Sequence, residues 1–196
     1  SDLKISSTLG KSFFISPLQE NQIKKIDGLV SYSKIIEERV LFTFGGKQEV
    51  TYLKGVDDAD FTKVNDIKTK IYNGQWFKPD TYQVVIGYGI AQKFSLGLLD
   101  FNNQLEVFVP KPGKGNIENP EQAFNKTDIF PVGIYAISED LDSKYVFSDL
   151  GLAQELLEYK SNQISGLEIK VKPATDESTL IEELQTIFNH KITVKN

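Results

Sequence analysis

The chain has 196 residues and a formal net charge of −5. Hydrophobic residues make up 40% of the sequence and charged residues 25%. This length and composition are typical of a globular protein that buries a sizeable core in one domain or two lobes. The basic residues are 21 lysines and one arginine, Arg39, so the bidentate contacts by which arginine recognises phosphate and guanine are nearly absent and nucleic acid is not an expected partner. The absence of cysteine excludes disulfides and thiolate chemistry.

The sequence also shows neither a membrane-spanning segment nor the usual N-terminal features of a complete protein. It contains no run of about eighteen apolar residues, no signal peptide and no initiator methionine. We therefore expect the chain to be a segment of a longer protein.

The first predicted elements are a strand at residues 3–6 and a helix that begins after Ser16. Ser16 is a good N-cap, Pro17 suits the first helical position, and Gln19 completes a capping box. We expect this helix to end at Gly28.

A hairpin and a β-α-β unit complete the two ends of the chain. Residues 29–44 and 48–56 read as strands joined by Gly45-Gly46, a typical hairpin turn. Near the C-terminus, residues 166–172 alternate as a strand, a helix follows, and residues 191–194 close as a strand. The helix places five apolar residues on one face: Leu180, Ile181, Leu184, Ile187 and Phe188.

Joined, the two ends predict an α+β fold in two lobes. Residues 1–57 and 165–196 would form a split βαβ sandwich with helices on one face of a mainly antiparallel sheet. Residues 58–164 would form an inserted, β-rich lobe.

The expected insertion begins with an amphipathic stretch and then alternates strands with short helices. The last of these helices follows a strand and is expected to be capped by Asp149. The predicted segments, in chain order, are 60–71, the strand-turn-helix at 84–94, and the strands 105–110, 130–137 and 144–150.

The turn between Val84 and Phe94 resembles part of a dinucleotide fingerprint. Gly87 and Gly89 follow an apolar strand and precede a short helix, but Gln92 occupies the place of the third glycine. That glycine lets helix and strand pack closely at the pyrophosphate. A structural glycine turn is therefore the preferred interpretation, and we expect no nucleotide binding.

Other polar residues also favour structural roles. His190 lies in the turn after the last helix, where an imidazole interacts with the helix dipole and solvent. The acidic stretch 57–60 lacks the ligand ladder of a calcium loop, and Glu37-Glu38 lie on opposite faces of a strand. Trp76 and Phe77 are expected in the core. The sequence thus predicts no catalytic residues, no metal site and no cofactor.

Several segments resemble, in order and spacing, a family of transporter permeases. They are VVIGYGIAQKFSLGLLDFNNQLEVFVP (84–110), FPVGIYAISEDLDSKYVFSDLGLAQELL (130–157) and SGLEIKV (165–171). Together they resemble the extracytoplasmic domain of ABC-transporter permeases of the lipoprotein-releasing LolC and LolE type, with a wider relation to MacB and FtsX. The resemblance implies that Gly87 and Gly89 shape a turn and bind no nucleotide.

The resemblance also implies a location and partners. In this family the domain lies between the first two transmembrane helices, on the periplasmic side of the bacterial inner membrane. ATP hydrolysis belongs to a separate cytoplasmic ABC ATPase subunit, so this chain would not be an enzyme. The full-length permease would pair with a second permease subunit, and the domain would take part in releasing lipoproteins to a periplasmic chaperone.

The long connection from Lys111 to Thr127 corresponds in position to the loop that engages this chaperone in LolC-type permeases. We expect Ile117, Pro120 and Phe124 to bind the partner, as the apolar and rigid positions of the loop. A flexible loop without a partner remains an alternative. A MacB-like efflux domain and an FtsX-like domain that regulates a cell-wall hydrolase also remain open.

Overall fold

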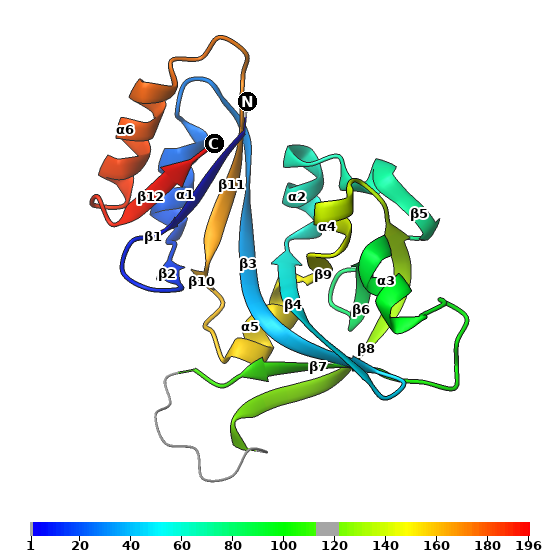
Figure 1. Cartoon of the computed structure of the whole chain (residues 1–196). Helices are drawn as coiled ribbons and strands as arrows, with labels where there is room; N and C mark the ends of the chain where they lie inside the picture. Colours follow the sequence, from blue (N-terminus) through cyan, green and yellow to red (C-terminus); the bar gives the residue numbers. More distant parts are fainter. Residues whose placement is uncertain (1, 113–121) are drawn as a thin grey trace. The chain divides into compact units, whose positions relative to one another are not determined.

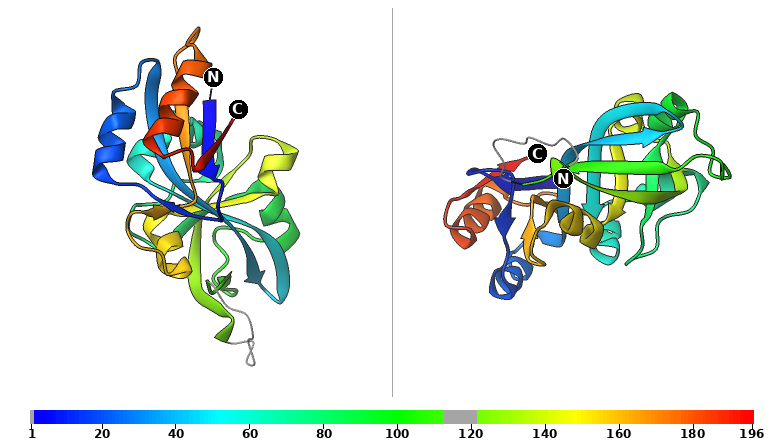
Figure 2. Two further views of the ribbon diagram at one scale, coloured as in Figure 1. Left: turned by 90° about the vertical axis from the view of Figure 1, so that its left-hand side faces the viewer. Right: turned by 90° about the horizontal axis from the view of Figure 1, so that it is seen from below.

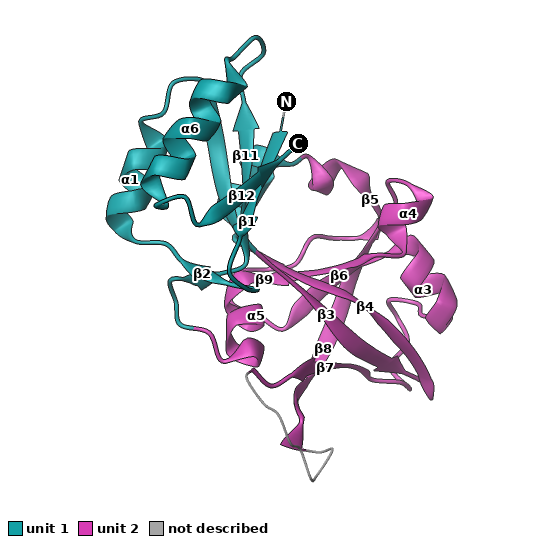
Figure 3. Cartoon of the chain, turned by 60° about the vertical axis from the view of Figure 1, so that its left-hand side comes forward, with its two compact units in different colours: residues 1–35, 57–65, 160–196 teal, residues 36–56, 66–159 magenta. Residues whose placement is uncertain are grey.

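The computed structural model describes residues 2–112 and 122–196 and divides the chain into two compact units (Figure 1, Figure 3). The first unit consists of residues 1–35, 57–65 and 160–196, and the second of residues 36–56 and 66–159. Both are mixed α/β structures rich in strands. The α+β class predicted from the sequence is confirmed in this coarse form.

The sheet of the first unit contains strands from both ends of the chain, in the order β12-β1-β11-β3. Each neighbouring pair is antiparallel, and the short strands β2 and β10 form a separate pair. Helices α1 and α6 lie side by side on one face of this sheet (Figure 1, Figure 2). The elements are β1 (Asp2–Ser7), β2 (Phe13–Phe14), α1 (Pro17–Lys24), the start of β3 (Leu29–Phe44), α2 (Asp58–Val64), β10 (Gln163–Ile164), β11 (Gly166–Val171), α6 (Glu177–Ile187) and β12 (Ile192–Lys195).

The second unit is a closed ring of six paired strands, in the order β3-β4-β9-β6-β8-β7 and back to β3. Strand β5 pairs with β8 outside this ring, and closure leaves the ring strands few free edges. The elements are the rest of β3, β4 (Lys47–Val56), η1 (Ile67–Lys70), β5 (Ile71–Gly74), β6 (Gln83–Gly87), α3 (Tyr88–Phe94), β7 (Leu105–Pro110), β8 (Phe124–Tyr135), α4 (Glu139–Asp142), β9 (Tyr145–Asp149) and α5 (Leu150–Leu157).

The bounds of these units differ from the lobes expected at 1–57 plus 165–196 and at 58–164. Residues 36–56 group with the second unit, whereas residues 57–65 and 160–164 group with the first. The reason lies in the long strand β3, whose first part pairs with β11 and whose second part pairs with β7. Strand alternation in a sequence does not indicate the partner of each part of a long strand.

Each unit has its own apolar core. In the first unit the buried residues of β1 and β11 pack with those of α1 and α6, and include Ile5, Ile23, Ile169 and Leu184. In the second unit the inward-facing residues of the ring pack with the apolar faces of α3 and α5. The hairpin turn predicted at Gly45-Gly46 is confirmed, with φ values of 56° and 81° that suit a two-residue turn.

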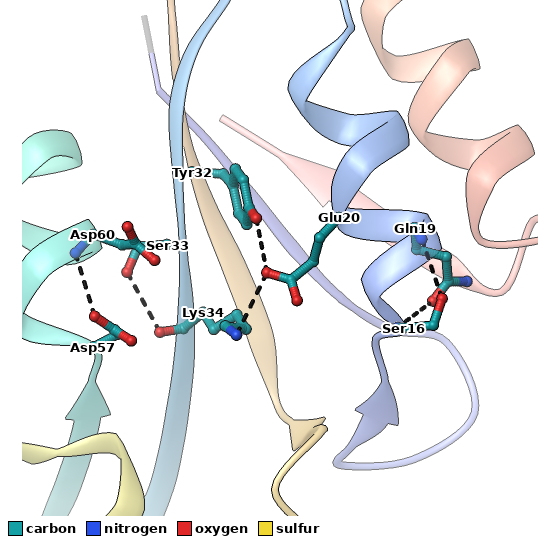
Figure 4. Close-up of polar contacts among 8 residues, drawn as sticks. All are labelled: Ser16, Gln19, Glu20, Tyr32, Ser33, Lys34, Asp57 and Asp60. Atoms are coloured by element: carbon teal, nitrogen blue, oxygen red, sulfur yellow. Dashed lines mark hydrogen bonds and ion pairs between the residues drawn. The ribbon is translucent and has the colours of Figure 1, made fainter.

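The predicted capping box at the start of α1 is present (Figure 4). The Ser16 hydroxyl accepts from the Gln19 amide at 3.1 Å, and the Ser16 amide donates to the Gln19 side-chain oxygen at 2.9 Å. Helix α1 ends at Lys24 and not at Gly28.

We expect Ser16→Ala to lower the free energy of unfolding by about 1 kcal/mol, measured by denaturant titration. Ser16→Asp, which keeps an acceptor, should stay close to the unsubstituted protein.

A half-buried polar cluster joins α1 to β3 in the first unit (Figure 4). The Tyr32 hydroxyl donates to the Glu20 carboxylate at 2.7 Å, and the Lys34 ammonium lies 3.4 Å from the same oxygen. Burial and the hydrogen bond to Glu20 raise the pKa of Tyr32 well above its usual range. Asp60 lies near, and burial raises the pKa of its carboxyl, with a further contribution from Asp57. The contacts of Glu20 hold the helix against the sheet.

Two strand-helix units of the second unit repeat each other. Strand β6 leads into α3 and β9 leads into α5, and the helices carry the matching segments Gly89-Ile90-Ala91-Gln92 and Gly151-Leu152-Ala153-Gln154. Both helices end at a left-handed residue other than glycine, Ser95 or Glu158. The strands β6 and β9 are antiparallel neighbours, and each has a parallel partner on its other side. The ring thus has an approximate internal two-fold repeat.

Candidate partner-binding arm

The glycine turn after β6 packs closely against the end of α4. A Cβ atom at Gly87 would overlap the backbone oxygen of Asp142, and one at Gly89 would overlap the Ser143 hydroxyl. The end of α4 and the residue that follows it therefore lie directly against the turn, where a side chain larger than hydrogen would not fit. The structural turn predicted for Gly87 and Gly89 is confirmed. The helix that follows the turn ends at Phe94, and its C-cap residue Ser95 has φ of 52°.

The β7–β8 hairpin carries the connection for which partner binding was predicted, and we call its described end the arm: residues 108–112 and 122–126. Pro110 pairs with Phe124, and the Lys111 amide donates to the Ala123 carbonyl at 2.8 Å. The loop predicted from Lys111 to Thr127 is therefore too long at its C-terminal end, because residues 124–127 belong to β8. Three of these four residues are polar, which obscured the strand in the sequence.

Of the three predicted partner-binding residues, only Phe124 lies among the described residues; Ile117 and Pro120 lie outside them. Phe124 is 37% exposed, and its ring meets that of Phe108 edge-on, with 6.5 Å between centroids. The Lys126 ammonium lies 5.8 Å from the centre of the Phe108 ring. One face of the arm therefore presents two aromatic rings with a lysine ammonium beside them, and aromatic residues are enriched in protein interfaces.

The remaining candidates lie outside the arm. Asp57 caps α2 by accepting from the Asp60 amide at 3.4 Å, and His190 is exposed in the turn after α6 with φ of 58°. Phe77 is 2% exposed, and Trp76 packs on it at 4.9 Å between ring centroids.

The ion pair between the Lys54 ammonium and the Glu37 carboxylate, which are 3.1 Å apart, was not predicted from the sequence. Lys54 is 6% exposed and its ammonium lies 4.9 Å from the centre of the Tyr145 ring. The feature of the sequence that could have indicated this ion pair is a lysine inside the apolar second half of a strand.

Within residues 2–112 and 122–196, no group of three or more histidine, aspartate or glutamate side chains is arranged to hold a metal ion. No helix of that part of the chain is both long and apolar enough to span a membrane.

Solved structures of two extracytoplasmic transporter domains have a similar fold. The extracellular domain of the noncanonic ABC-type transporter YknZ from Gram-positive bacteria superimposes with a TM-score of 0.68 and 12% identity, covering 100% of both chains. The periplasmic region of MacB from Actinobacillus actinomycetemcomitans gives 0.64 and 14% identity, covering 100% of this chain and 88% of that one. At these identities the likeness shows the fold.

A curated sequence relative is the lipoprotein-releasing system transmembrane protein LolE of Haemophilus influenzae. It is 28% identical over 159 residues, which cover 79% of this chain and 35% of LolE. The chain thus matches about a third of that protein. No protein-family model matches the sequence. The resemblance to extracytoplasmic domains of LolC/LolE-type, MacB-like permeases is confirmed by these comparisons.

Proposed function

We propose that the chain is the periplasmic domain of a permease that releases lipoproteins from the bacterial inner membrane and passes them to a periplasmic chaperone. The single observation that carries this is the similarity to LolE across 79% of the chain. The full-length permease would work with a cytoplasmic ATPase and a second permease subunit. The domain itself would contribute binding and not catalysis.

The pairing of the first and last strands supports the permease part of the proposal. Strands β1 and β12 are antiparallel neighbours in which Lys4 pairs with Lys195. The two strands therefore lie side by side in the sheet of the first unit (Figure 1). This arrangement suits a domain inserted between two consecutive transmembrane helices, because both helices enter the same membrane.

The surface of the arm supports the proposal that the domain binds a periplasmic chaperone. The arm carries exposed aromatic surface in Phe124 on a paired hairpin, and a preformed surface loses less entropy when it binds. We infer that the arm, with Ile117, Pro120 and Phe124, contacts the chaperone.

The test is to replace residues 112–122 by Asn-Gly. Because the Lys111 amide donates to the Ala123 carbonyl at 2.8 Å, these two residues form the hydrogen-bonded pair that a two-residue turn requires on its two sides. The free-energy cost of closing a loop changes by only about 0.6 kcal/mol when the loop length is halved. We therefore expect the melting temperature of the shortened domain to change little. Capture of the cognate periplasmic lipoprotein chaperone by the purified domain should be lost.

Equal capture by the shortened and intact domains would contradict the proposed role of the arm. An efflux adaptor or a cell-wall hydrolase that binds the intact domain in place of the chaperone would instead favour a MacB-like or FtsX-like permease. A matched control is Phe130→Ser, which replaces an exposed ring in β8 outside the arm and should leave capture unchanged.

A further inference from the structure

The arm extends beyond the lateral support of the six-stranded ring. Strand β7 pairs with β3 only from Glu106 to Phe108, and β8 pairs with β6 only from Phe130 onward. At Val109 and Pro110 the β7–β8 pair is therefore a two-stranded ribbon within the described part of the chain. A two-stranded hairpin alone is marginally stable in water, so its direction depends on whatever else contacts it.

The Asn125 side chain connects this ribbon to α5 by hydrogen bonds. The Asn125 amide nitrogen donates to the backbone oxygen of Leu156 at 2.8 Å and to the carboxylate of Glu158 at 3.0 Å. Asn125 is paired with Val109, and Val109 belongs to the same buried cluster as Leu156. Asn125 thus lies on the inner face of the hairpin, at the point where the apolar row of β7 and β8 ends.

The hydrogen bond from Asn125 to Leu156 acts as a C-cap of helix α5 that is supplied by a side chain of strand β8. The last carbonyl groups of an α-helix have no partner within the helix, and the Asn125 amide satisfies that of Leu156. Glu158 is held in the left-handed conformation, with φ of 58°, and its own amide closes onto Gln154 and Glu155. A fixed helix end therefore holds the Glu158 carboxylate in place to accept from the arm.

From these contacts we propose that Asn125 is a positioning residue, which fixes the direction of the arm relative to the ring through the C-terminal turn of α5. The proposal rests on the proposed function in one respect: if the arm contacts a chaperone, Asn125 determines how that surface is presented. Its effect on the geometry of the arm is independent of any partner.

A second contact to α5, made by the residue that precedes β6, provides a matched control. The Tyr82 hydroxyl donates to the Glu155 carboxylate at 3.2 Å, and the Tyr82 carbonyl accepts from the Phe130 amide. Tyr82→Phe removes a hydrogen bond to the same helix but changes no hydrogen bond of the arm. Both variants should therefore cost similar, small amounts of stability, whereas only Asn125→Ala should release the arm.

The direct measurement is a spin-label distance between the arm and the ring. The chain contains no cysteine, so Lys111→Cys in the arm and exposed Gln92→Cys in α3 give one defined label pair. We expect a narrow distance distribution in the otherwise unsubstituted domain and in Tyr82→Phe, and one that is broadened about twofold by Asn125→Ala. An unchanged distribution in Asn125→Ala would overturn the proposal.

A charge-matched rescue separates positioning from general destabilisation. Asn125→Asp places a carboxylate beside Glu158 and should broaden the distribution further, because like charges repel. In the double variant Asn125→Asp/Glu158→Gln, the amide introduced at position 158 can donate to the carboxylate introduced at position 125. The charge repulsion is then removed, although the Leu156 carbonyl still lacks the donor that Asn125 supplies, so the distribution should be narrower than in Asn125→Asp. The absence of any narrowing relative to Asn125→Asp would also contradict the proposal.

Chaperone capture by the same variants then tests the two proposals separately. If both hold, Asn125→Ala weakens capture about tenfold and Tyr82→Phe does not. If the distance distribution broadens but the intact domain captures no chaperone, Asn125 still positions the arm and only the proposed function fails. If the distribution is unchanged while the intact domain captures the chaperone, the positioning role fails and the proposed function stands.

Discussion

Gly87→Ala is expected to lower the free energy of unfolding by about 3 kcal/mol, at the upper end of the range for overpacking. The added Cβ would overlap the backbone oxygen of Asp142 and lie 2.9 Å from the Tyr135 hydroxyl. A backbone oxygen cannot rotate away, so either the turn at Gly87 or the end of α4 must move. Because the side chains of both faces of β6 are buried, the shift would also disturb its pairing with β8 and β9.

Two other glycines form a graded series with Gly87. A Cβ at Gly89 meets the Ser143 hydroxyl, which can rotate, and alanine is about 1 kcal/mol better than glycine within a helix; the net change should be small. A Cβ at Gly97 meets nothing within 4 Å. Thermal unfolding should show a loss of about 6–12 °C for Gly87→Ala and little for Gly97→Ala. Equal melting temperatures for these two would show that the close approach is not required.

Tyr135→Phe is expected to cost about 2 kcal/mol, although it removes one oxygen atom. The Tyr135 side chain is fully buried, and burial raises its pKa well above the usual range of tyrosine. Its hydroxyl accepts from the Tyr145 amide at 3.2 Å and lies 2.7 Å from the Tyr145 carbonyl and 2.8 Å from that of Leu141. The hydroxyl therefore links β8, the end of α4 and the start of β9.

The measurement is the free energy of unfolding by denaturant titration, with Tyr82→Phe as the matched control. Tyr82 is 41% exposed and its hydroxyl contacts the Glu155 carboxylate near the surface, so its loss should cost no more than about 0.5 kcal/mol. Equal effects of the two substitutions would mean that water or a shift of β9 replaces the hydroxyl of Tyr135.

Local features of the chain were predictable because neighbouring residues determine them. The capping box at Ser16, the two-glycine turn at Gly45-Gly46 and the caps at Asp57 and Asp149 each depend on a few consecutive residues. The alternating strands and the amphipathic helix α6 follow from hydrophobic period. The repeated Gly-x-Ala-Gln segments of α3 and α5 were also visible in the sequence, and they were the missed signal of the repeat within the ring.

The candidate site was predictable only in part. The position of the β7–β8 connection and the aromatic residue Phe124 followed from the sequence. Its pairing with Pro110, the ring of Phe108 beside it and the contact from Asn125 to Leu156 did not. The last contact joins residues 31 positions apart, and an asparagine in a mainly polar stretch gives no indication of its partner.

The sequence by itself thus determined which segments form helices and strands, where most of them begin, and that the glycine turn at Gly87 is structural. Only the tertiary structure decided that β3 is shared between two units, that six strands close into a ring, and that the end of α4 fills the space before Gly87. The physical reason is that propensities, caps and turns act over a few residues, whereas strand partners are chosen by burial and register across the whole chain.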